Sequence, residues 1–389
     1  MKRQPMTGVE PAMLQWARQS MGLSVQDVAR AVKKQVRVIE DWESGDGAPT
    51  YAEMEKLAYT VFKRPLALFF LPAPPDELPP RREFRTLPDT DIQSLAADTH
   101  LHIRRAHAYQ LALKELFDRS PSERAIWRAI SLNVHAPVQS QARAVRDYLE
   151  FTLDQQTACK SDDDALKQWR EAVETTGVFV FKAAFRQKDV SGFCLMDAEV
   201  PLVYLNNSTS KTRQTFSLLH ELVHLLLSLN GLSKFDTSYI DRLPAKERQI
   251  ERFCNAIAAE MLMPAEDFRQ HAAKFPDNVE AATEQQFADL AARYAVSREV
   301  VLRRFLDVGR ASRAFYEQKA KQWAAQRKEG TGGSWYASQN AYLSERFAHE
   351  VVRRHDRKQI SVEQASELLG IKPKNYAGLE QRIVQGADA

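Results

Sequence analysis

The sequence predicts an α+β fold with an all-α amino-terminal domain, a small sheet in the middle of the chain and an all-α carboxy-terminal region. Residues 12–70 carry apolar side chains at helical spacing, in short segments separated by turn residues. Short apolar runs, typical of buried strands, lie at 178–181, 190–195 and 201–206. Beyond residue 264 the periodicity is again helical, which completes the α, α+β, α order.

Length and composition indicate an ordinary intracellular protein of several domains. A chain of 389 residues, 44% of them hydrophobic, has material for about two to four domains. Its cysteines, Cys159, Cys194 and Cys254, show neither paired nor metal-ligand spacing, which favours a reducing cytoplasmic location. Since no apolar run approaches about 18 residues, we expect no contact with a membrane.

The amino-terminal domain, residues 1–72, has the pattern of a helix-turn-helix. Ser24 and Asp27 form a capping-box pattern that opens a helix over 25–32. A tight turn then leads to a second helix over 35–43, which Ser44-Gly45 ends.

The start of this second helix is where such domains read base edges, so Gln35 and Arg37 are the candidates for base contacts. Lys33 and Lys34 precede them and are candidates for phosphate contacts, together with Arg30. Residues 1–70 carry ten Lys or Arg against eight Asp or Glu, a net charge of +2 that is low for a DNA-binding domain. The alternative is a helix-turn-helix that binds protein.

The segment His220-Glu221-Leu222-Val223-His224 lies in an apolar run that predicts a helix. At about 100° per residue, the two histidines and Glu221 fall on one sector of that helix. This is the H-E-x-x-H pattern, in which the histidines bind zinc and the glutamate handles the proton of a metal-bound water. Chance stacking of histidines on a core helix is the alternative. It would leave three polar groups unsatisfied in an apolar helix, at considerable cost.

Zinc in a catalytic site needs a third protein ligand, and the helical block 247–264 offers it. Glu251 and Asn255 are four residues apart and share a face, which makes Glu251 the expected ligand and Asn255 a residue that steadies a ligand ring. Glu260 points to the opposite side. Glu247 lies near the Glu251 face and is the alternative ligand, although a solvated position near the helix start suits it better.

With these two motifs the chain resembles the ImmA/IrrE metallopeptidases, over roughly residues 165–310. The segment Glu251-Arg-Phe-Cys-Asn255-Ala-Ile-Ala-Ala-Glu-Met-Leu-Met-Pro264 is similar to that family's third-ligand segment, with Cys254 where Ala is usual and Ile257 where Phe is usual. The resemblance implies a zincin-like fold, a Zn²⁺ cofactor and cleavage of a specific repressor or antitoxin-like protein in a stress or mobile-element response. Residues 12–70, including Trp42-Glu43-Ser44-Gly45, resemble the Xre/lambda-repressor-like domains that are fused to such peptidases.

Two features of the expected catalytic domain remain open at this level. We expect the strand at 201–206 to lie at an edge of the sheet, where an extended substrate can add by backbone hydrogen bonds, although an ordinary interior position is compatible with the sequence. For the group that stabilises the oxyanion, the candidates are His271, Tyr239 and Tyr294, and the sequence does not choose between them.

The predicted function is therefore a zinc endopeptidase tethered to a domain that binds double-stranded DNA, and a homodimer is compatible with it. The alternative is a transcriptional regulator or antitoxin that uses the peptidase domain as a sensor or scaffold, although a scaffold has no need of Glu221. A digestive protease fits the composition poorly.

The expected domains are residues 1–72, a proline-rich linker at 73–90, helices at 91–160, the metallopeptidase domain at 161–275, helix-turn-helix-like helices at 276–312 and a mildly basic helical region at 313–389.

Overall fold

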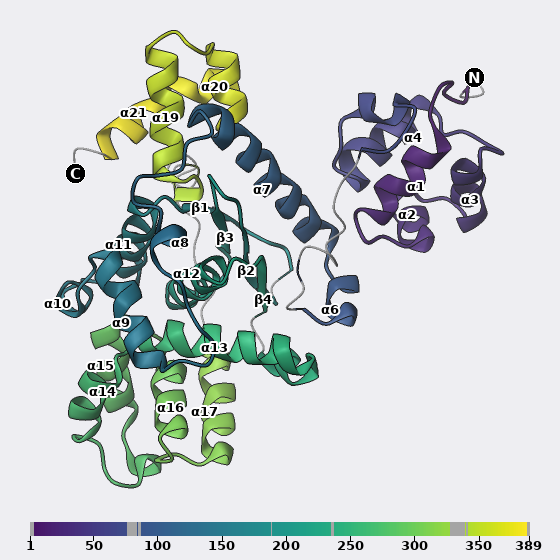
Figure 1. Cartoon of the computed structure of the whole chain (residues 1–389). Coiled ribbons are helices and arrows are strands. Elements are labelled where there is room, and N and C mark those ends of the chain that lie inside the picture. Colours follow the sequence, from purple (N-terminus) through teal and green to yellow (C-terminus); the bar gives the residue numbers. More distant parts are fainter. Residues whose placement is uncertain are drawn as a thin grey trace. The chain divides into compact units, whose positions relative to one another are not determined.

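The structure is a computed structural model that describes residues 4–75, 84, 87–187, 189–234, 237–326, 339 and 341–386. The chain divides into two compact units (Figure 1). One contains Met1–Arg105 and Phe185–Gln187, and the other contains Ala106–Ala184 and Lys188–Ala389. Much of the predicted proline-rich linker, residues 76–83, 85 and 86, lies outside the described residues.

The described helices of the first unit confirm the predicted all-α amino-terminal domain, to which an isolated β-bridge between Pro5 and Thr50 is added. A core that includes Met13, Val28, Ile39 and Trp42 holds its helices together. The helices are α1 (Pro11–Gln19), α2 (Val25–Val32), α3 (Val36–Ser44), α4 (Tyr51–Glu55), the π-helix η1 (Lys56–Val61), the 3-10 helix η2 (Leu66–Phe70), α6 (Asp89–Gln93) and the first part of α7 (Ala97–Leu116).

Local sequence signals set the ends of the helix-turn-helix. Ser24 accepts a hydrogen bond from the Asp27 amide while the Asp27 side chain binds the Ser24 amide, which is the predicted capping box of α2. Lys33 adopts a left-handed conformation with φ of 59° and ends α2. Gly45, with φ of 89°, ends α3 in the same way, because only glycine adopts this conformation without cost.

The second unit contains a four-stranded sheet in the order β1-β3-β2-β4. The strands are β1 (Phe179–Ala183), β2 (Val190–Leu195), β3 (Leu202–Asn206) and β4 (Gly231–Lys234). β1 pairs with β3 in parallel, whereas β2 is antiparallel to both β3 and β4. The expectation that 201–206 forms an edge strand is wrong, because β1 and β2 cover both of its sides. β4, which follows the H-E-x-x-H helix, is the edge strand beside β2.

Helices surround this sheet. Before and between the strands lie the rest of α7, α8 (Ile126–Ala129), α9 (Val138–Leu149), α10 (Leu153–Thr157), α11 (Asp162–Thr175) and α12 (Lys211–Leu226). After the sheet come η3 (Thr237–Arg242), α13 (Ala245–Leu262), α14 (Ala265–Ala272), η4 (Val279–Ala281), α15 (Glu284–Tyr294), α16 (Arg298–Asp307), α17 (Arg313–Ala325), α19 (Glu345–Asp356), α20 (Val362–Leu368), η5 (Pro373–Asn375) and α21 (Tyr376–Gly386). Within the described ranges, none of the helices is both long and apolar enough to cross a membrane.

Helix α12 is the centre of this unit. Ser210 caps its start by accepting a hydrogen bond from the Arg213 amide. The helix contacts α11, α13 and strands β2, β3 and β4, so side chains on nearly all of its faces are buried. One hydrophobic core extends from α9 through α12 and α13 to Phe287 on α15 and Phe305 on α16. Ser297 caps α16 by accepting a hydrogen bond from the Val300 amide.

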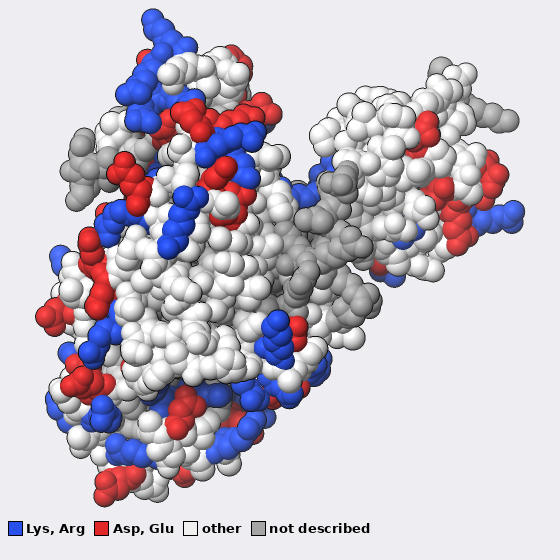
Figure 2. Space-filling model, viewed as in Figure 1, with Lys and Arg blue, Asp and Glu red and all other residues white. Residues whose placement is uncertain are grey.

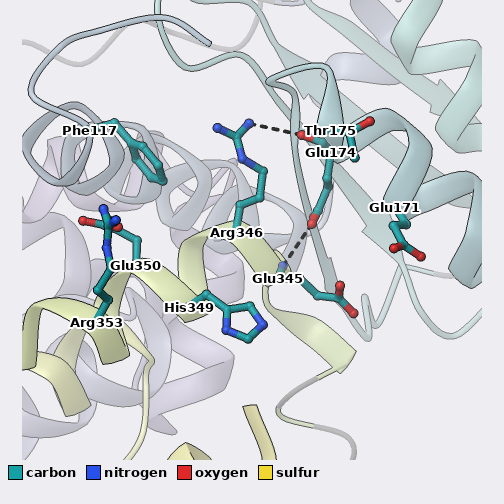
Figure 3. A pocket seen from close by; sticks show the side chains of 9 residues that line it. All are labelled: Phe117, Glu171, Glu174, Thr175, Glu345, Arg346, His349, Glu350 and Arg353. Carbon is teal, nitrogen blue, oxygen red and sulfur yellow. Dashed lines mark hydrogen bonds and ion pairs between the residues drawn. The ribbon is translucent and has the colours of Figure 1, made fainter. Parts of the chain in front are cut away.

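Helix α19, in the carboxy-terminal region, packs against α11 and β1. The Glu345 amide donates a hydrogen bond to the Glu174 carboxylate, and Arg346 donates to the Glu174 carbonyl oxygen (Figure 3). Phe347 makes an edge contact with Phe181 of β1. Beside these contacts, between α11 and α19, lies a cavity of about 480 Å³.

Candidate metal centre

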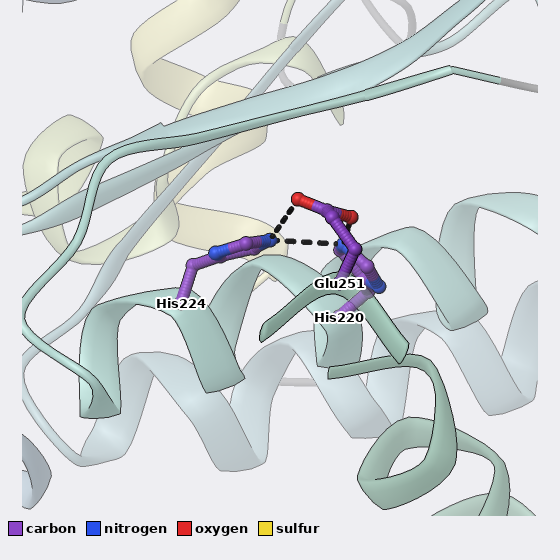
Figure 4. A group of neighbouring side chains, drawn as sticks. All are labelled: His220, His224 and Glu251. Atoms are coloured by element: carbon purple, nitrogen blue, oxygen red, sulfur yellow. Dashed lines mark hydrogen bonds and ion pairs between the residues drawn. The ribbon is translucent and has the colours of Figure 1, made fainter. Parts of the chain in front are cut away.

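Three side chains converge between α12 and α13 (Figure 4). His220 and His224 lie one turn apart on α12, and their Nε2 atoms are 3.0 Å apart. Glu251 comes from α13: its Oε2 is 3.3 Å from Nε2 of His220, and its Oε1 is 3.2 Å from Nε2 of His224. Ligand atoms placed about 2.0–2.1 Å from a tetrahedral zinc ion lie about 3.3 Å from one another, so the spacing of these atoms fits such an ion.

The cluster is buried, with exposed fractions of 2%, 0% and 0% for His220, His224 and Glu251. Burial alone would raise the pKa of Glu251, but the facing imidazoles of His224 and His220 lower it below the ordinary range. The carboxylate is therefore ionised. Cys254 lies nearby on α13, and burial raises the pKa of its thiol, which stays protonated and neutral.

Two further side chains fix the orientation of the cluster. Asn255 Oδ1 is 3.0 Å from Nδ1 of His220, so a proton on Nδ1 leaves Nε2 free to face Glu251. Tyr239 donates a hydrogen bond of 3.0 Å to Oε2 of Glu251. The pKa of Tyr239 is well above its ordinary value, first through burial and then through the Glu251 charge, so the phenol keeps its proton.

Of the three residues considered for the oxyanion, only Tyr239 lies at this cluster. His271 is 3.4 Å from a carboxylate oxygen of Asp267, and Tyr294 donates a hydrogen bond to the same carboxylate. Both of these residues are therefore engaged on α14 and α15 and make no contact with the histidines of α12.

Glu221 is fully buried beside the cluster. Its Oε1 accepts a hydrogen bond from the Ser233 hydroxyl of β4. Among the described residues, no group hydrogen-bonds to its Oε2. A Cβ atom at Gly231 would lie 2.6 Å from that Oε2, which shows how closely β4 approaches the carboxylate. Sequence reasoning missed both Gly231 and Ser233.

A small depression leads from the surface to His220 and is lined by Ser233, Tyr239 and Asn255, together with Arg213, Phe216, Ser217 and Lys234. Arg213 was also missed from the sequence. Its guanidinium donates to the Ser191 hydroxyl at 3.0 Å and to the Lys234 carbonyl oxygen at 2.7 Å, and so joins α12 to β2 and to the end of β4.

The remaining acidic candidates lie away from the cluster. Glu247 is half-buried at the start of α13, and its carboxylate does not belong to the cluster of His220, His224 and Glu251. Glu260 points to the other side of α13 and forms an ion pair with Arg304, as the helical spacing predicted.

The residues expected to contact DNA lie on the first unit. Lys33, Gln35 and Arg37 are exposed at the turn between α2 and α3 and on the first turn of α3. Lys34 is exposed as well, although its Nζ lies 2.6 Å from a carboxylate oxygen of Glu53. In the view of Figure 2 this unit shows acidic and basic side chains close together and mostly uncharged surface.

Family models match both parts of this architecture. Residues 173–306 match the IrrE N-terminal-like domain (Peptidase_M78), and residues 14–58 match a helix-turn-helix model. The chain joins an Xre-type helix-turn-helix domain to an IrrE-type metallopeptidase domain. No curated protein matches the chain. The residues of the IrrE-type match include the whole sheet, α12 and α13, and continue into α16. Helices α12, α13 and α16 share one hydrophobic core.

Proposed function

We propose that this protein is a zinc-dependent endopeptidase coupled to a DNA-binding domain. It cleaves a specific repressor or antitoxin-like protein and thereby controls gene expression in a stress or mobile-element response. The observation that carries the proposal is the convergence of His220, His224 and Glu251 beside a buried carboxylate, Glu221, whose Oε2 accepts no hydrogen bond from the described part of the chain. The family matches make peptide hydrolysis the reaction class that fits this arrangement.

His220, His224 and Glu251 are the residues that would hold the ion. Two imidazoles and one carboxylate are a ligand set of catalytic zinc, which leaves a position for water. Bound there, zinc supplies a Lewis acid that polarises the scissile carbonyl and acidifies water. Asn255 keeps the His220 ring in the orientation and tautomer that binding requires.

Glu221 is the proposed general base. Its Oε2 takes the proton from the attacking water and then returns it to the leaving amine, which typically contributes about 10²–10⁴-fold to the rate. Tyr239 is the proposed donor to the oxyanion, because it keeps its proton and lines the depression that includes His220. In this role its hydroxyl would turn from Glu251 Oε2, to which it donates in the structure, toward the substrate.

The proposed substrate-binding edge is β4. It is the last strand in the order β1-β3-β2-β4, so an extended peptide can add to it through backbone hydrogen bonds. The same strand contacts Glu221 through Ser233, which would bring a peptide bound along β4 next to the catalytic groups.

Metal analysis tests the ligand assignment. We expect one zinc per chain in the wild type and in Glu247→Ala, and a loss of zinc affinity in Glu251→Ala. Asn255→Ala is expected to weaken binding by about 10–100-fold. Full retention of zinc by Glu251→Ala, as measured by elemental analysis after dialysis, would show the ligand assignment to be wrong.

Glu221→Gln separates the peptidase from the alternative regulator. The amide keeps the size of the side chain but lacks basicity, so zinc content and fold are expected to be unchanged while cleavage falls sharply. The same variant serves as a substrate trap, in which the captured partner is identified by mass spectrometry. A full regulatory response from Glu221→Gln, together with its loss in His220→Ala, would contradict the peptidase proposal and favour a metal-dependent regulator.

DNA recognition is proposed for the first unit through Lys33, Lys34, Gln35 and Arg37. Arg37→Ala is expected to lower the preference for the operator by roughly 1–3 kcal/mol, and Lys34→Ala to weaken all sites alike and reduce the salt dependence. Lys374→Ala, an exposed change outside this unit, is the control. Footprinting that finds no protected site near the protein's own locus at any salt concentration would favour a protein-binding role.

A further inference from the structure

The Glu221 carboxylate has two oxygens in different surroundings. Oε1 accepts the hydrogen bond of the Ser233 hydroxyl, whereas Oε2 receives none from the described residues. Ser233 is itself 5% exposed and Glu221 is fully buried, so water does not compete for this hydrogen bond at the surface. One oxygen is therefore held in place, and the other is left for proton transfer.

The register of β4 places Ser233 over Glu221. Ser233 pairs with Gly192 of β2, and Gly231 pairs with Cys194, so both residues lie on the same face of β4. That face looks toward α12, since Ser233 contacts Glu221 and a Cβ atom at Gly231 would contact Glu221 and His224.

Two contacts fix this register at either end of the strand. The Gly231 amide lies 3.2 Å from Sγ of Cys194, and the Arg213 guanidinium of α12 donates to the Lys234 carbonyl oxygen. Ser233 lies between them. Its position relative to α12 is therefore set by the sheet and by Arg213, and does not depend on Glu221 alone.

We propose that Ser233 is the positioning residue of Glu221, and that the substrate-binding edge strand thereby sets the geometry of the general base. A serine hydroxyl at this place holds Oε1, so that the side chain keeps the rotamer in which Oε2 faces the proton. Without the hydroxyl, the neutral Cys194 thiol, a weaker hydrogen-bonding partner, is what remains beside the carboxylate, and we expect Glu221 to sample other rotamers. The inference rests on the proposed peptidase function.

Three variants of the full chain, loaded with zinc, test this positioning role. Ser233→Ala removes the hydroxyl, Ser233→Thr keeps it, and Ser366→Ala is the control. Ser366 is a buried serine of α20 in the same unit, and its hydroxyl makes no hydrogen bond with the described residues. The probe is a library of fluorescence-quenched peptides of random sequence, followed by kinetics on the best-cleaved member.

For Ser233→Ala we expect kcat to fall by about 10–100-fold, with KM and zinc content unchanged, because misplacement of a catalytic group lowers the rate without removing binding contacts. Ser233→Thr and Ser366→Ala are expected to stay within a few-fold of the wild type. Full kcat in Ser233→Ala, or a loss as large in Ser233→Thr, would overturn the inference. Loss of zinc along with activity in Ser233→Ala would also overturn it, because the role would then be structural.

A second measurement does not depend on cleavage. If wild-type protein with zinc cleaves neither a member of the library nor a protein captured by Glu221→Gln, the peptidase function itself fails. Crystal structures of the wild type and Ser233→Ala then decide the positioning role separately. We expect the Glu221 carboxylate to leave its wild-type rotamer in Ser233→Ala, and an unchanged rotamer would refute the inference.

Discussion

Replacing Gly231 with alanine is expected to damage the metal centre while leaving the rest of the fold intact. The backbone of Gly231 is outside the left-handed region, so alanine adopts it without strain and the effect is one of space alone. The new methyl group would lie 2.6 Å from Oε2 of Glu221, 2.6 Å from Cδ2 of His224 and 2.7 Å from Cγ of the same ring.

Ordinary contacts of a Cβ atom begin at 3.4 Å, so relief requires a shift of about 0.8 Å in β4 or in α12. Neither Glu221 nor His224 can move away easily. Ser233 hydrogen-bonds to Glu221, and Nε2 of His224 lies 3.2 Å from Oε1 of Glu251. Overpacking of this kind costs about 1–3 kcal/mol of stability. A shift of about 1 Å in a catalytic group lowers the rate by about 10²-fold, and we expect zinc affinity to fall by about 10–100-fold.

Zinc competition with a chromogenic chelator and thermal denaturation measure these effects. Gly309→Ala is the matched control, because Gly309 has φ of 74° and an added Cβ meets nothing within 4 Å. That change is expected to cost about 1 kcal/mol of stability through backbone strain and to leave zinc binding unchanged. Wild-type zinc affinity and cleavage in Gly231→Ala would refute the close packing of β4 against α12.

Two further predictions concern buried charges in the second unit. Arg146→Met should lower the free energy of unfolding by about 1–3 kcal/mol, because buried oxygens of Phe151, Gln156 and Met261 lose their donor. Arg143→Met, on the exposed side of the same helix, should change it by less than about 0.5 kcal/mol in urea denaturation. Burial, with a smaller contribution from neighbouring cations, lowers the pKa of Lys182 from 10.5 to about 7. The unfolded chain then binds more protons between pH 7 and 10.5, so stability rises with pH across that window. Lys182→Met should therefore stabilise the protein by about 5 kcal/mol near pH 6 and by little near pH 10.5, whereas exposed Lys167→Met should have little effect at either pH.

The elements that sequence predicts well are those with local causes. The capping box of Ser24 and Asp27 sets the start of α2, and the structure places that helix at the predicted residues. The one-face spacing of His220, Glu221 and His224, and the four-residue step from Glu251 to Asn255, follow from helical geometry alone. In each case residues a few positions apart determine the geometry through the helix itself, so the prediction needs no knowledge of contacts between distant segments.

The features that were missed depend on how distant segments pair. β4 has four residues, Gly-Leu-Ser-Lys, which is too short for alternation to show. The order of strands in a sheet does not follow from their order along the chain. Because β1 pairs in parallel with β3, residues 201–206 lie in the interior of the sheet. Gly231 and Ser233 acquire their roles only once β4 is registered against β2, so no local signal could have found them.

The geometry of the candidate metal centre depends on contacts far from it, because Glu251 lies on a different helix from the two histidines. The carboxy-terminal end of α13 is held by a buried polar network: Arg146 of α9 donates to the Met261 carbonyl oxygen and to Gln156, and Gln156 donates to the Leu262 carbonyl oxygen at 2.9 Å. These carbonyls end a helix and have no partner within it, so the network both caps α13 and fixes its axis against α9 and α10. Burial lowers the pKa of Arg146 to about 10, so the guanidinium stays charged at neutral pH and holds this end of the helix. The ligand spacing at Glu251 is thus maintained from both sides, by α12 at the cluster and by α9 and α10 at the far end of α13.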